Sequence, residues 1–215
     1  MNNLLNRKAI SNEAQMVREL KKEVPLNSAN EKAFLSVNRA AFVPRGFENK
    51  AYRLDALPIK GNQFISSPLT VAKMTHYLDP EGCDSVLELG CGSGYQAAIL
   101  SKLCRRVFSI ERIGSLLDEA NNTFKRERLN NIMTKHDDAQ LGWSRYAPYE
   151  RILFSATATK IPEALFEQLS EGGILVAPMA VNDKEIITRY TKKSGKIVEE
   201  TLDVCSFVPV LDGKA

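Results

Sequence analysis

The stretch Val86–Gln96, VLELGCGSGYQ, decides the fold that we expect for this chain. Its first half is an apolar run with one acidic residue, Glu88, which is typical of a buried β-strand. Its second half places Gly90, Gly92 and Gly94 directly before a helical pattern. Glycine lets a backbone approach a ligand closely, and the free N–H groups of a helix start face that ligand. The order of strand, glycine turn and helix therefore predicts a nucleotide-binding unit.

The sequence on the carboxyl side of this stretch alternates between strand and helix patterns. Strands are expected at 84–89, 106–111, 132–135, 149–155 and 173–178, and helices at 94–103, 113–129 and 162–168. Such alternation is typical of an α/β fold, in which helices cover both faces of a parallel sheet. Two further strands, at 184–191 and 198–204, have little helix between them. We expect these two to join one edge of the sheet as antiparallel strands.

The sequence on the amino side is polar, and residues 1–50 have a largely helical pattern. Helices are expected at 11–22, 28–41 and 67–78. Ser28 or Asn30 can cap the second helix, and Ser67, directly before a proline, is placed to cap the third. Prolines and a glycine interrupt the segment 43–65, which we expect to be irregular. These features predict an N-terminal helical extension beside the sheet.

Composition narrows the classes of protein that fit. The 215 residues are 44% hydrophobic, which is enough for one compact domain. The 29 basic and 26 acidic residues nearly balance, which argues against a nucleic-acid or membrane partner. No apolar run is long enough to cross a bilayer, and the first residues lack a signal-peptide layout. We therefore expect a cytoplasmic protein.

Residues suited to binding a transition metal are few. The four cysteines include no C-x-x-C pair, and the only histidines are His76 and His136. Because a zinc site needs more ligands at closer spacing, we expect no bound metal. The cysteines are then expected to be reduced, buried thiols.

The glycine spacing and the acidic residues after the strands distinguish between kinds of nucleotide site. A dinucleotide site favours G-x-G-x-x-G, but the third glycine here comes one residue early, and a Walker loop's Gly-Lys-Ser/Thr is absent. Glu111 ends the next strand, where an acidic residue can accept hydrogen bonds from ribose hydroxyls. Glu88, Glu111 and Asp138 are expected along one edge of the sheet. Taken singly, each is as well explained as a solvated loop residue.

Together, the E-x-G-x-G-x-G pattern of residues 88–94 and the later acids resemble the first motif of class I S-adenosylmethionine-dependent methyltransferases. The resemblance implies that the loop containing Gly90 and Gly92 lies under the methionine part of the cofactor. It also implies that Glu111 holds the ribose, and that Asp138 with the Ala139 N–H reads the adenine. S-adenosylhomocysteine is then the product left in the site.

The residues after the fourth expected strand separate the methyltransferase subclasses. Enzymes that methylate amino groups of nucleic acids carry [DN]-P-P-[YF] there, whereas this chain has SATA at 155–158. The Pro-Cys dipeptide typical of base C5 methylation is missing, and no carboxylate cluster for a divalent metal is evident. All three subclasses are therefore disfavoured.

Motifs spread over roughly residues 30–212 make the resemblance narrower. They include R-x-x-F-V-P at 39–44, Q-x-I-S-x-P at 63–68, SIERI at 109–113, LGW at 141–143, G-G-I-L-V-x-P at 172–178 and F-V-P at 207–209. These motifs resemble the protein-L-isoaspartate O-methyltransferase family. The resemblance implies an α/β, Rossmann-like, seven-stranded, mostly parallel sheet with helices on both faces and an N-terminal helical extension. We expect a single domain, 1–215, with a substrate-side segment (1–78), a cofactor-binding core (79–180) and C-terminal edge strands (181–215).

The same resemblance implies an activity and an active-site serine. The activity is methyl transfer, by a monomer, to the free α-carboxylate of L-isoaspartyl residues in damaged proteins and peptides. Ser66 matches the family's serine and is expected to orient that carboxylate, with Phe64, Ile65, Ser66 and Arg112 contacting the cofactor. A carboxylate is ionised at neutral pH, so the reaction needs no general base. A methyltransferase of this fold acting on another carboxylate or a small molecule, or a non-catalytic cofactor-binding module, remains an alternative.

The chain departs from the family pattern close to the expected site. Phe64 stands where the family has threonine, and Asn62, Asp137 and Ala139 stand where it has glycine. Together these departures bear on acceptor preference and catalytic efficiency.

Overall fold

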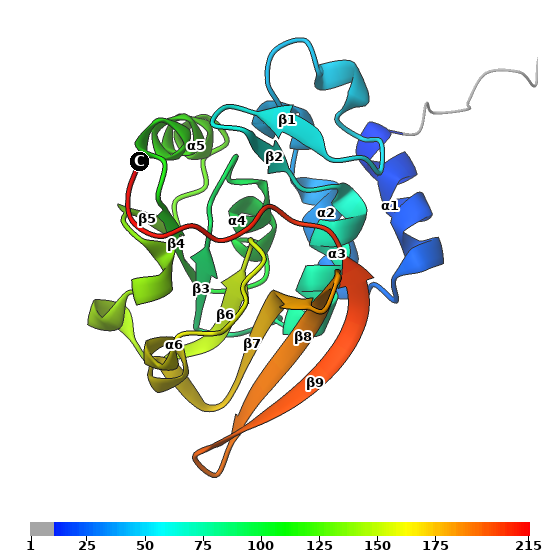
Figure 1. Cartoon of the computed structure of the whole chain (residues 1–215). Helices are drawn as coiled ribbons and strands as arrows, with labels where there is room; N and C mark the ends of the chain where they lie inside the picture. The colour runs from blue at the N-terminus through cyan, green and yellow to red at the C-terminus, as the bar shows by residue number, and fades with distance from the viewer. Residues whose placement is uncertain (1–10) are drawn as a thin grey trace, which may run out of the picture.

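A computed structural model describes residues 11–215 as a seven-stranded sheet flanked by helices (Figure 1). The helical pattern expected for residues 1–10 lies outside the described residues. The strands of the main sheet are β3 (Ser85–Leu89), β4 (Arg106–Glu111), β5 (Ile132–His136), β6 (Tyr149–Phe154), β7 (Leu169–Val181), β8 (Lys184–Lys193) and β9 (Lys196–Cys205). The helices are α1 (Asn12–Glu23), α2 (Ser28–Ser36), α3 (Pro68–Leu78), α4 (Tyr95–Leu100), α5 (Gly114–Arg126) and α6 (Glu163–Glu167).

The strand order is β5-β4-β3-β6-β7-β8-β9. The five strands from β5 to β7 are parallel, and β8 and β9 follow as antiparallel strands at one edge, as the sequence predicts. Strand β3 pairs with both β4 and β6, so the chain changes its direction of travel across the sheet at β3. In open α/β sheets, ligands bind outside the carboxyl ends of the strands at such a switch point. The glycine turn after β3 lies at that point.

Side chains of the strands alternate between two hydrophobic clusters, one on each face of the sheet. Val86 and Val107 pack on the face covered by α1 to α5. Leu87 and Phe108 pack on the other face, together with Leu165 of the short helix α6 and aromatic residues of the loops. Strand residues with period two thus build a core on both sides of the sheet. The expected helices on both faces are confirmed, but the long helices lie mainly on one of them.

The N-terminal helices differ from expectation at one end. Helix α2 ends at Ser36, and the 3-10 helix η1 (Arg39–Phe42) follows it, so the single helix expected at 28–41 is wrong. The residue that caps α2 is Asn27, whose side chain accepts a hydrogen bond from the Asn30 N–H at 2.7 Å. The caps expected from the sequence, Ser28 or Asn30, are therefore wrong. The backbone becomes extended at the buried residue Val37, and this change of direction places Arg39 in the core. Ser11 and Ser67 cap α1 and α3.

The segment expected to be irregular contains a β-hairpin. Strands β1 (Leu57–Ile59) and β2 (Gln63–Ile65) pair antiparallel, with Pro58 opposite Phe64. Two three-residue strands are too short to show an alternating pattern, and a proline inside one of them argues against a strand. In Figure 1 the hairpin lies above the carboxyl ends of the main strands, so it carries Phe64 to the ligand side of the sheet.

We predict that Gly94→Ala lowers the free energy of unfolding by about 2–4 kcal/mol, because two penalties add. Gly94 has a φ of +86°, and a Cβ there meets the buried Phe124 ring at 2.6 Å. The control is Gly82→Ala, where φ is +74° but nothing lies within 4 Å of the added Cβ. Urea unfolding of both variants measures the difference. Equal losses of stability would show that the contact with Phe124 relaxes freely and would contradict the prediction.

Candidate active site

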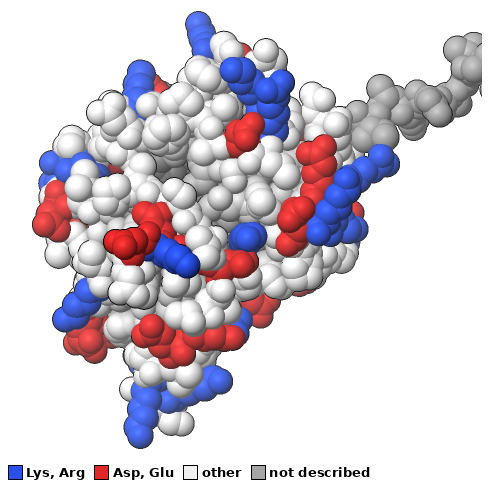
Figure 2. Space-filling model, turned by 45° about the vertical axis from the view of Figure 1, so that its right-hand side comes forward, with Lys and Arg blue, Asp and Glu red and all other residues white. Residues whose placement is uncertain are grey.

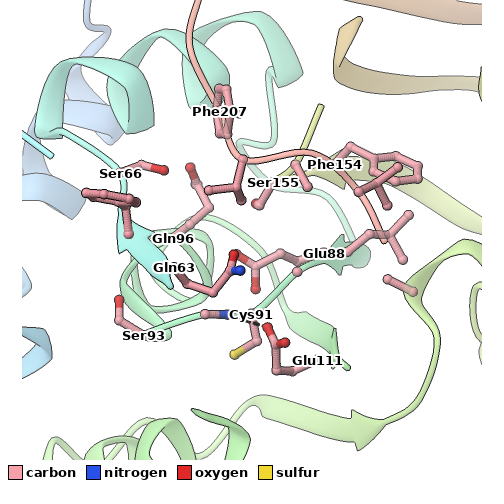
Figure 3. Close-up of a pocket in the computed structure, with 18 of the residues that line it drawn as sticks. Gln63, Ser66, Glu88, Cys91, Ser93, Gln96, Glu111, Phe154, Ser155 and Phe207 are labelled. Carbon is pink, nitrogen blue, oxygen red and sulfur yellow. Dashed lines mark hydrogen bonds between the residues drawn. The ribbon is translucent and has the colours of Figure 1, made fainter. Parts of the chain in front are cut away.

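A cavity opens at the carboxyl ends of β3, β4 and β6, where the switch point lies (Figure 3). Its walls come from six stretches of the chain: the segment from β2 into α3, the glycine turn with its flanks, the end of β4, Ala139 after β5, the end of β6 with the residues after it, and the C-terminal segment after β9. The expected site residues that line it are Phe64, Ile65, Ser66, Glu88, Gly90, Gly92, Glu111, Arg112 and Ala139. The fold therefore brings nearly all of them together from distant parts of the sequence.

The carboxylate of Glu111 fixes the glycine turn. One of its oxygens accepts from the Gly92 N–H at 2.8 Å, and the other accepts from the Ile113 N–H at 2.9 Å. The side chain is almost wholly buried at the end of β4. Because each carboxylate oxygen can accept two hydrogen bonds, each still has a lone pair for a ligand. This arrangement suits a pair of neighbouring hydroxyl groups such as those of a ribose.

Glu88 lies in the middle of the cavity floor in Figure 3 and is fully buried. One of its carboxylate oxygens accepts from the hydroxyl of Ser109, its direct partner on β4, and the other oxygen has no hydrogen-bond partner. Burial raises the pKa of Glu88 to about 8, and the Ser109 hydrogen bond opposes this rise. A buried carboxyl group with a free oxygen that faces a cavity suits a cationic ligand group, which would favour its ionised form.

Ser66 lies in the connection between β2 and α3, on the opposite side of Glu88 from Glu111 (Figure 3). Its neighbour Ser67 is the helix cap, because the Ser67 hydroxyl accepts from the Thr70 N–H at 3.0 Å. The Ser66 hydroxyl makes no hydrogen bond to the rest of the described chain and lines the cavity. It is therefore free to donate to a ligand.

The C-terminal segment 206–215 crosses the mouth of the cavity as an extended strap, drawn red in Figure 1. Thr157 exchanges two backbone hydrogen bonds with the strap, to Val208 and from Val210, each 2.8 Å long. Phe207 and Leu211 line the cavity from above. The F-V-P motif thus forms part of a crossing strap. The Phe207 N–H donates to the Glu185 carboxylate of β8 at 2.6 Å, and Pro209 forms an isolated bridge with Thr157.

The strap ends on Asp138, which the family resemblance assigns to the adenine side, and on Arg112, which it assigns to the cofactor. The Asp138 carboxylate accepts from the Gly213 N–H at 2.8 Å and from the Gln140 N–H at 2.9 Å, and Asp138 does not line the cavity. The Arg112 guanidinium donates to the Gly213 and Asp212 carbonyls at 2.9 and 3.1 Å. Ala139 is buried and faces the cavity. In this arrangement Asp138 and Arg112 hold the strap.

Sequence reasoning missed several residues of the cavity wall. Tyr95 and Gln96 begin α4 and are buried, and Phe154 and Ser155 come from the end of β6 (Figure 3). The signal for the first two was their place directly after the last glycine, where a helix start faces the ligand. Phe154 and Ser155 could also have been predicted, because both parallel strands that flank a switch point contribute residues to the site.

Charged side chains lie around the site more than in it. On the face shown in Figure 2, basic and acidic residues are interspersed around a hollow bordered by uncharged atoms. Within residues 11–215, no group of three or more histidine, cysteine or acidic side chains is placed to hold a metal ion. Among the side chains that line the cavity, the buried acids Glu88 and Glu111 and the Ser66 hydroxyl each have hydrogen-bonding capacity left for a ligand.

Comparisons with known proteins identify a family. Residues 11–215 match the family model described as protein-L-isoaspartate(D-aspartate) O-methyltransferase. A protein-L-isoaspartate O-methyltransferase of Helicobacter pylori (strain G27) is 53% identical over 199 residues, covering 92% of this chain and 95% of the relative. One of Maricaulis maris is 44% identical over 177 residues, with 82% and 83% covered.

A solved structure shows the same fold. It is a Plasmodium falciparum protein described as a protein-L-isoaspartate O-methyltransferase, crystallised in complex with S-adenosyl-L-homocysteine. It superposes with a TM-score of 0.83 at 21% identity, covering 94% of this chain and 99% of that chain. The seven-stranded, mostly parallel sheet expected from the sequence is thereby confirmed.

We predict that Glu88→Gln flattens the pH dependence of stability between about pH 5 and pH 8. The raised pKa of about 8 means that the native state keeps a proton which the unfolded state loses near the ordinary value of 4.5. Native Glu88 therefore lowers the free energy of unfolding as pH rises through this window, by up to about 1.4 kcal/mol per pH unit.

The measurement is urea unfolding of the wild type and variant at half-unit pH steps. The matched control is Glu167→Gln, which removes an exposed carboxylate of α6 and should keep the wild-type slope. A Glu88→Gln variant with the wild-type slope would show that Glu88 is ionised in the native state and would contradict the assignment.

Proposed function

The chain belongs to the protein-L-isoaspartate O-methyltransferase family, and from this premise we propose how its own residues carry out the reaction. The reaction moves a methyl group from S-adenosylmethionine to the free α-carboxylate of an L-isoaspartyl residue. The observation that carries the proposal is one cavity with a free serine hydroxyl on one side and two buried acidic side chains on the other. Those two sides suit an anionic acceptor and a cationic nucleoside, respectively.

On the cofactor side, we assign three contacts. The free lone pairs of Glu111 accept from the ribose hydroxyls, and the turn at Gly90 and Gly92 lets the backbone lie close under the methionine part. The free oxygen of Glu88 faces the positive charge of the cofactor. Ala139 forms a small, buried part of the wall beside the adenine. Asp138 contributes indirectly, because its carboxylate holds the C-terminal strap that crosses the cavity. Phe64, Ile65 and Arg112 complete the walls.

On the acceptor side, Ser66 orients the substrate. Bound S-adenosylmethionine supplies an electrophilic methyl group on a positively charged sulfur. The Ser66 hydroxyl donates to one oxygen of the acceptor carboxylate and so holds the other oxygen toward the methyl carbon. That carboxylate is already ionised at neutral pH, so no protein group has to remove a proton. Phe64, Phe207 and Leu211 exclude water from the line of transfer, since all three border the cavity mouth.

The product is a neutral methyl ester, which is why the reaction leads to repair. The ester closes spontaneously to a succinimide when the following backbone nitrogen attacks the ester carbonyl and methanol leaves. Addition of water to the succinimide then yields normal aspartate in part. The acceptors are isoaspartyl proteins and peptides. In an isoaspartyl residue the backbone continues through the side-chain carbonyl, so the α-carboxylate is free and is attached directly to Cα. Selection of this carboxylate is a matter of geometry at the cavity mouth.

We further propose that the enzyme is a cytoplasmic monomer. All walls of the cavity come from one chain, so a second copy is not needed to complete the site. Four free cysteines, three of them buried, fit a reducing compartment. Among the described residues, no helix is long and apolar enough to cross a membrane.

The proposal predicts selective methylation in a matched pair of synthetic peptides that carry isoaspartate or aspartate at the same position. We expect transfer of labelled methyl from S-adenosylmethionine to the isoaspartyl peptide alone, as a base-labile ester. Methylation of another carboxylate or a small molecule in place of this peptide would contradict it. Cofactor binding without transfer to any acceptor would identify the chain as a non-catalytic binding module.

A second prediction separates the two adjacent serines. Ser66→Ala should lower kcat/KM about tenfold to a hundredfold, since one hydrogen bond to a charged group is lost. It should leave the free energy of unfolding nearly unchanged. Ser67→Ala should instead destabilise the fold by about 1 kcal/mol through loss of the α3 cap, with kcat/KM nearly intact. The reverse pattern would show that Ser66 has only a structural role.

A further inference from the structure

Arg39 is a fully buried arginine that contacts the backbone of the active-site serine. Its Nε donates to the Ala51 carbonyl at 2.7 Å, and one terminal nitrogen donates to the Ser66 carbonyl at 2.8 Å. The guanidinium also lies over the ring of Tyr95, 4.4 Å from its centre. Tyr95 is the first residue of α4, directly after the glycine turn. One side chain thus joins the Ser66 connection to the cofactor-binding turn.

The charge of Arg39 has no acidic partner in the described part of the chain. Arg39 takes part in none of the ion pairs within residues 11–215, and its second terminal nitrogen is buried without a hydrogen bond. Burial lowers its pKa, while contact with Tyr95 opposes that shift. A buried charge held only by carbonyls and a ring is costly to the fold. Where a sequence retains such a cost, a functional reason is expected.

We propose that Arg39 is the positioning residue of Ser66, setting the orientation of its hydroxyl toward the acceptor carboxylate. This inference rests on the proposed function. Ser66 precedes the cap of α3, so its peptide is held on one side by that helix and on the other by β2. The hydrogen bond from Arg39 fixes the Ser66 carbonyl, and with it the rotation of the peptide that carries the Ser66 side chain. Arg39 itself touches neither acceptor nor cofactor, because it does not line the cavity.

The planar guanidinium is what this role requires. Its Nε and one terminal nitrogen reach two carbonyls, those of Ala51 and Ser66, while its flat face covers the Tyr95 ring. A lysine keeps the positive charge but has a single nitrogen and no flat face. Arg39→Lys therefore loosens the Ser66 carbonyl while leaving a cation in the same buried place.

The test is a double-mutant cycle on kcat/KM for an isoaspartyl peptide at saturating S-adenosylmethionine. We expect Arg39→Lys to lower kcat/KM about tenfold in the wild-type background, equivalent to one net hydrogen bond. In a Ser66→Ala background the same change should have less than about a twofold effect, because the group it positions is gone. The dissociation constant of S-adenosylhomocysteine should change by less than about threefold, since no hydrogen bond from Arg39 reaches Glu88, Glu111 or the glycine turn.

A structural role would give a different result. Loss of general stability lowers kcat/KM equally in both backgrounds and weakens cofactor binding in parallel, and that outcome would overturn the proposal. Arg39→Gln, which keeps a donor without the charge, goes through the same cycle, so the conclusion does not depend on the folding of one variant. The matched control is Arg151→Lys. Arg151 is a residue of β6 that does not line the cavity, and its Nε donates to the Asp79 carbonyl at 2.8 Å. Its substitution by lysine should show no coupling to Ser66→Ala.

The same data separate failure of this inference from failure of the proposed function. If the wild type does not methylate the isoaspartyl peptide, the proposed function falls and the role of Arg39 falls with it. If the wild type and Ser66→Ala behave as expected but Arg39→Lys acts equally in both backgrounds, only the inference about Arg39 is overturned.

Discussion

The hydrogen bonds of the Glu111 carboxylate are the constraint on which the rest of the site depends. They tie the glycine turn after β3 to the end of β4 and to the start of the segment that follows it, through the Gly92 and Ile113 N–H groups. The turn can take this path because Gly90, Gly92 and Gly94 all have positive φ, a region that other residues rarely enter. Helix α4 then begins at Tyr95, where it meets Arg39, and the Glu88 side chain lies beside the turn. Each later feature of the cavity is placed relative to this link.

Two buried ionisable groups show that the site is not built for stability. Glu88 and Arg39 are both fully buried, neither has a partner of opposite charge among residues 11–215, and each has one polar atom without a hydrogen bond. They have different tasks in this account. Glu88 faces the cavity and can be stabilised by a cationic ligand, whereas Arg39 lies behind the acceptor side and acts through the backbone of Ser66. In the proposed function, binding and orientation thus depend on groups whose burial lowers the stability of the fold.

Much of the fold could be predicted because its signals are local. The apolar runs that become β3, β4 and β6, the glycines after β3 and the Ser67-Pro68 helix start each follow from a few neighbouring residues. The hairpin of β1 and β2 could not, because its strands are three residues long and depend on contacts made after folding. The same holds for Arg39, whose sequence neighbourhood looks like an exposed helix end but folds into the core. Asp138 was placed at the correct edge, yet only the tertiary fold shows that the strap reaches its carboxylate.

A crystal structure of the enzyme with S-adenosylhomocysteine and an isoaspartyl peptide tests the central claim most directly. We predict the peptide α-carboxylate within about 2.5–3.0 Å of the Ser66 Oγ, as in an O–H···O hydrogen bond. We also predict the ribose hydroxyls on Glu111, with the Gly92 and Ile113 hydrogen bonds retained. A peptide carboxylate bound away from Ser66, or a ribose that makes no contact with Glu111, would contradict the central claim.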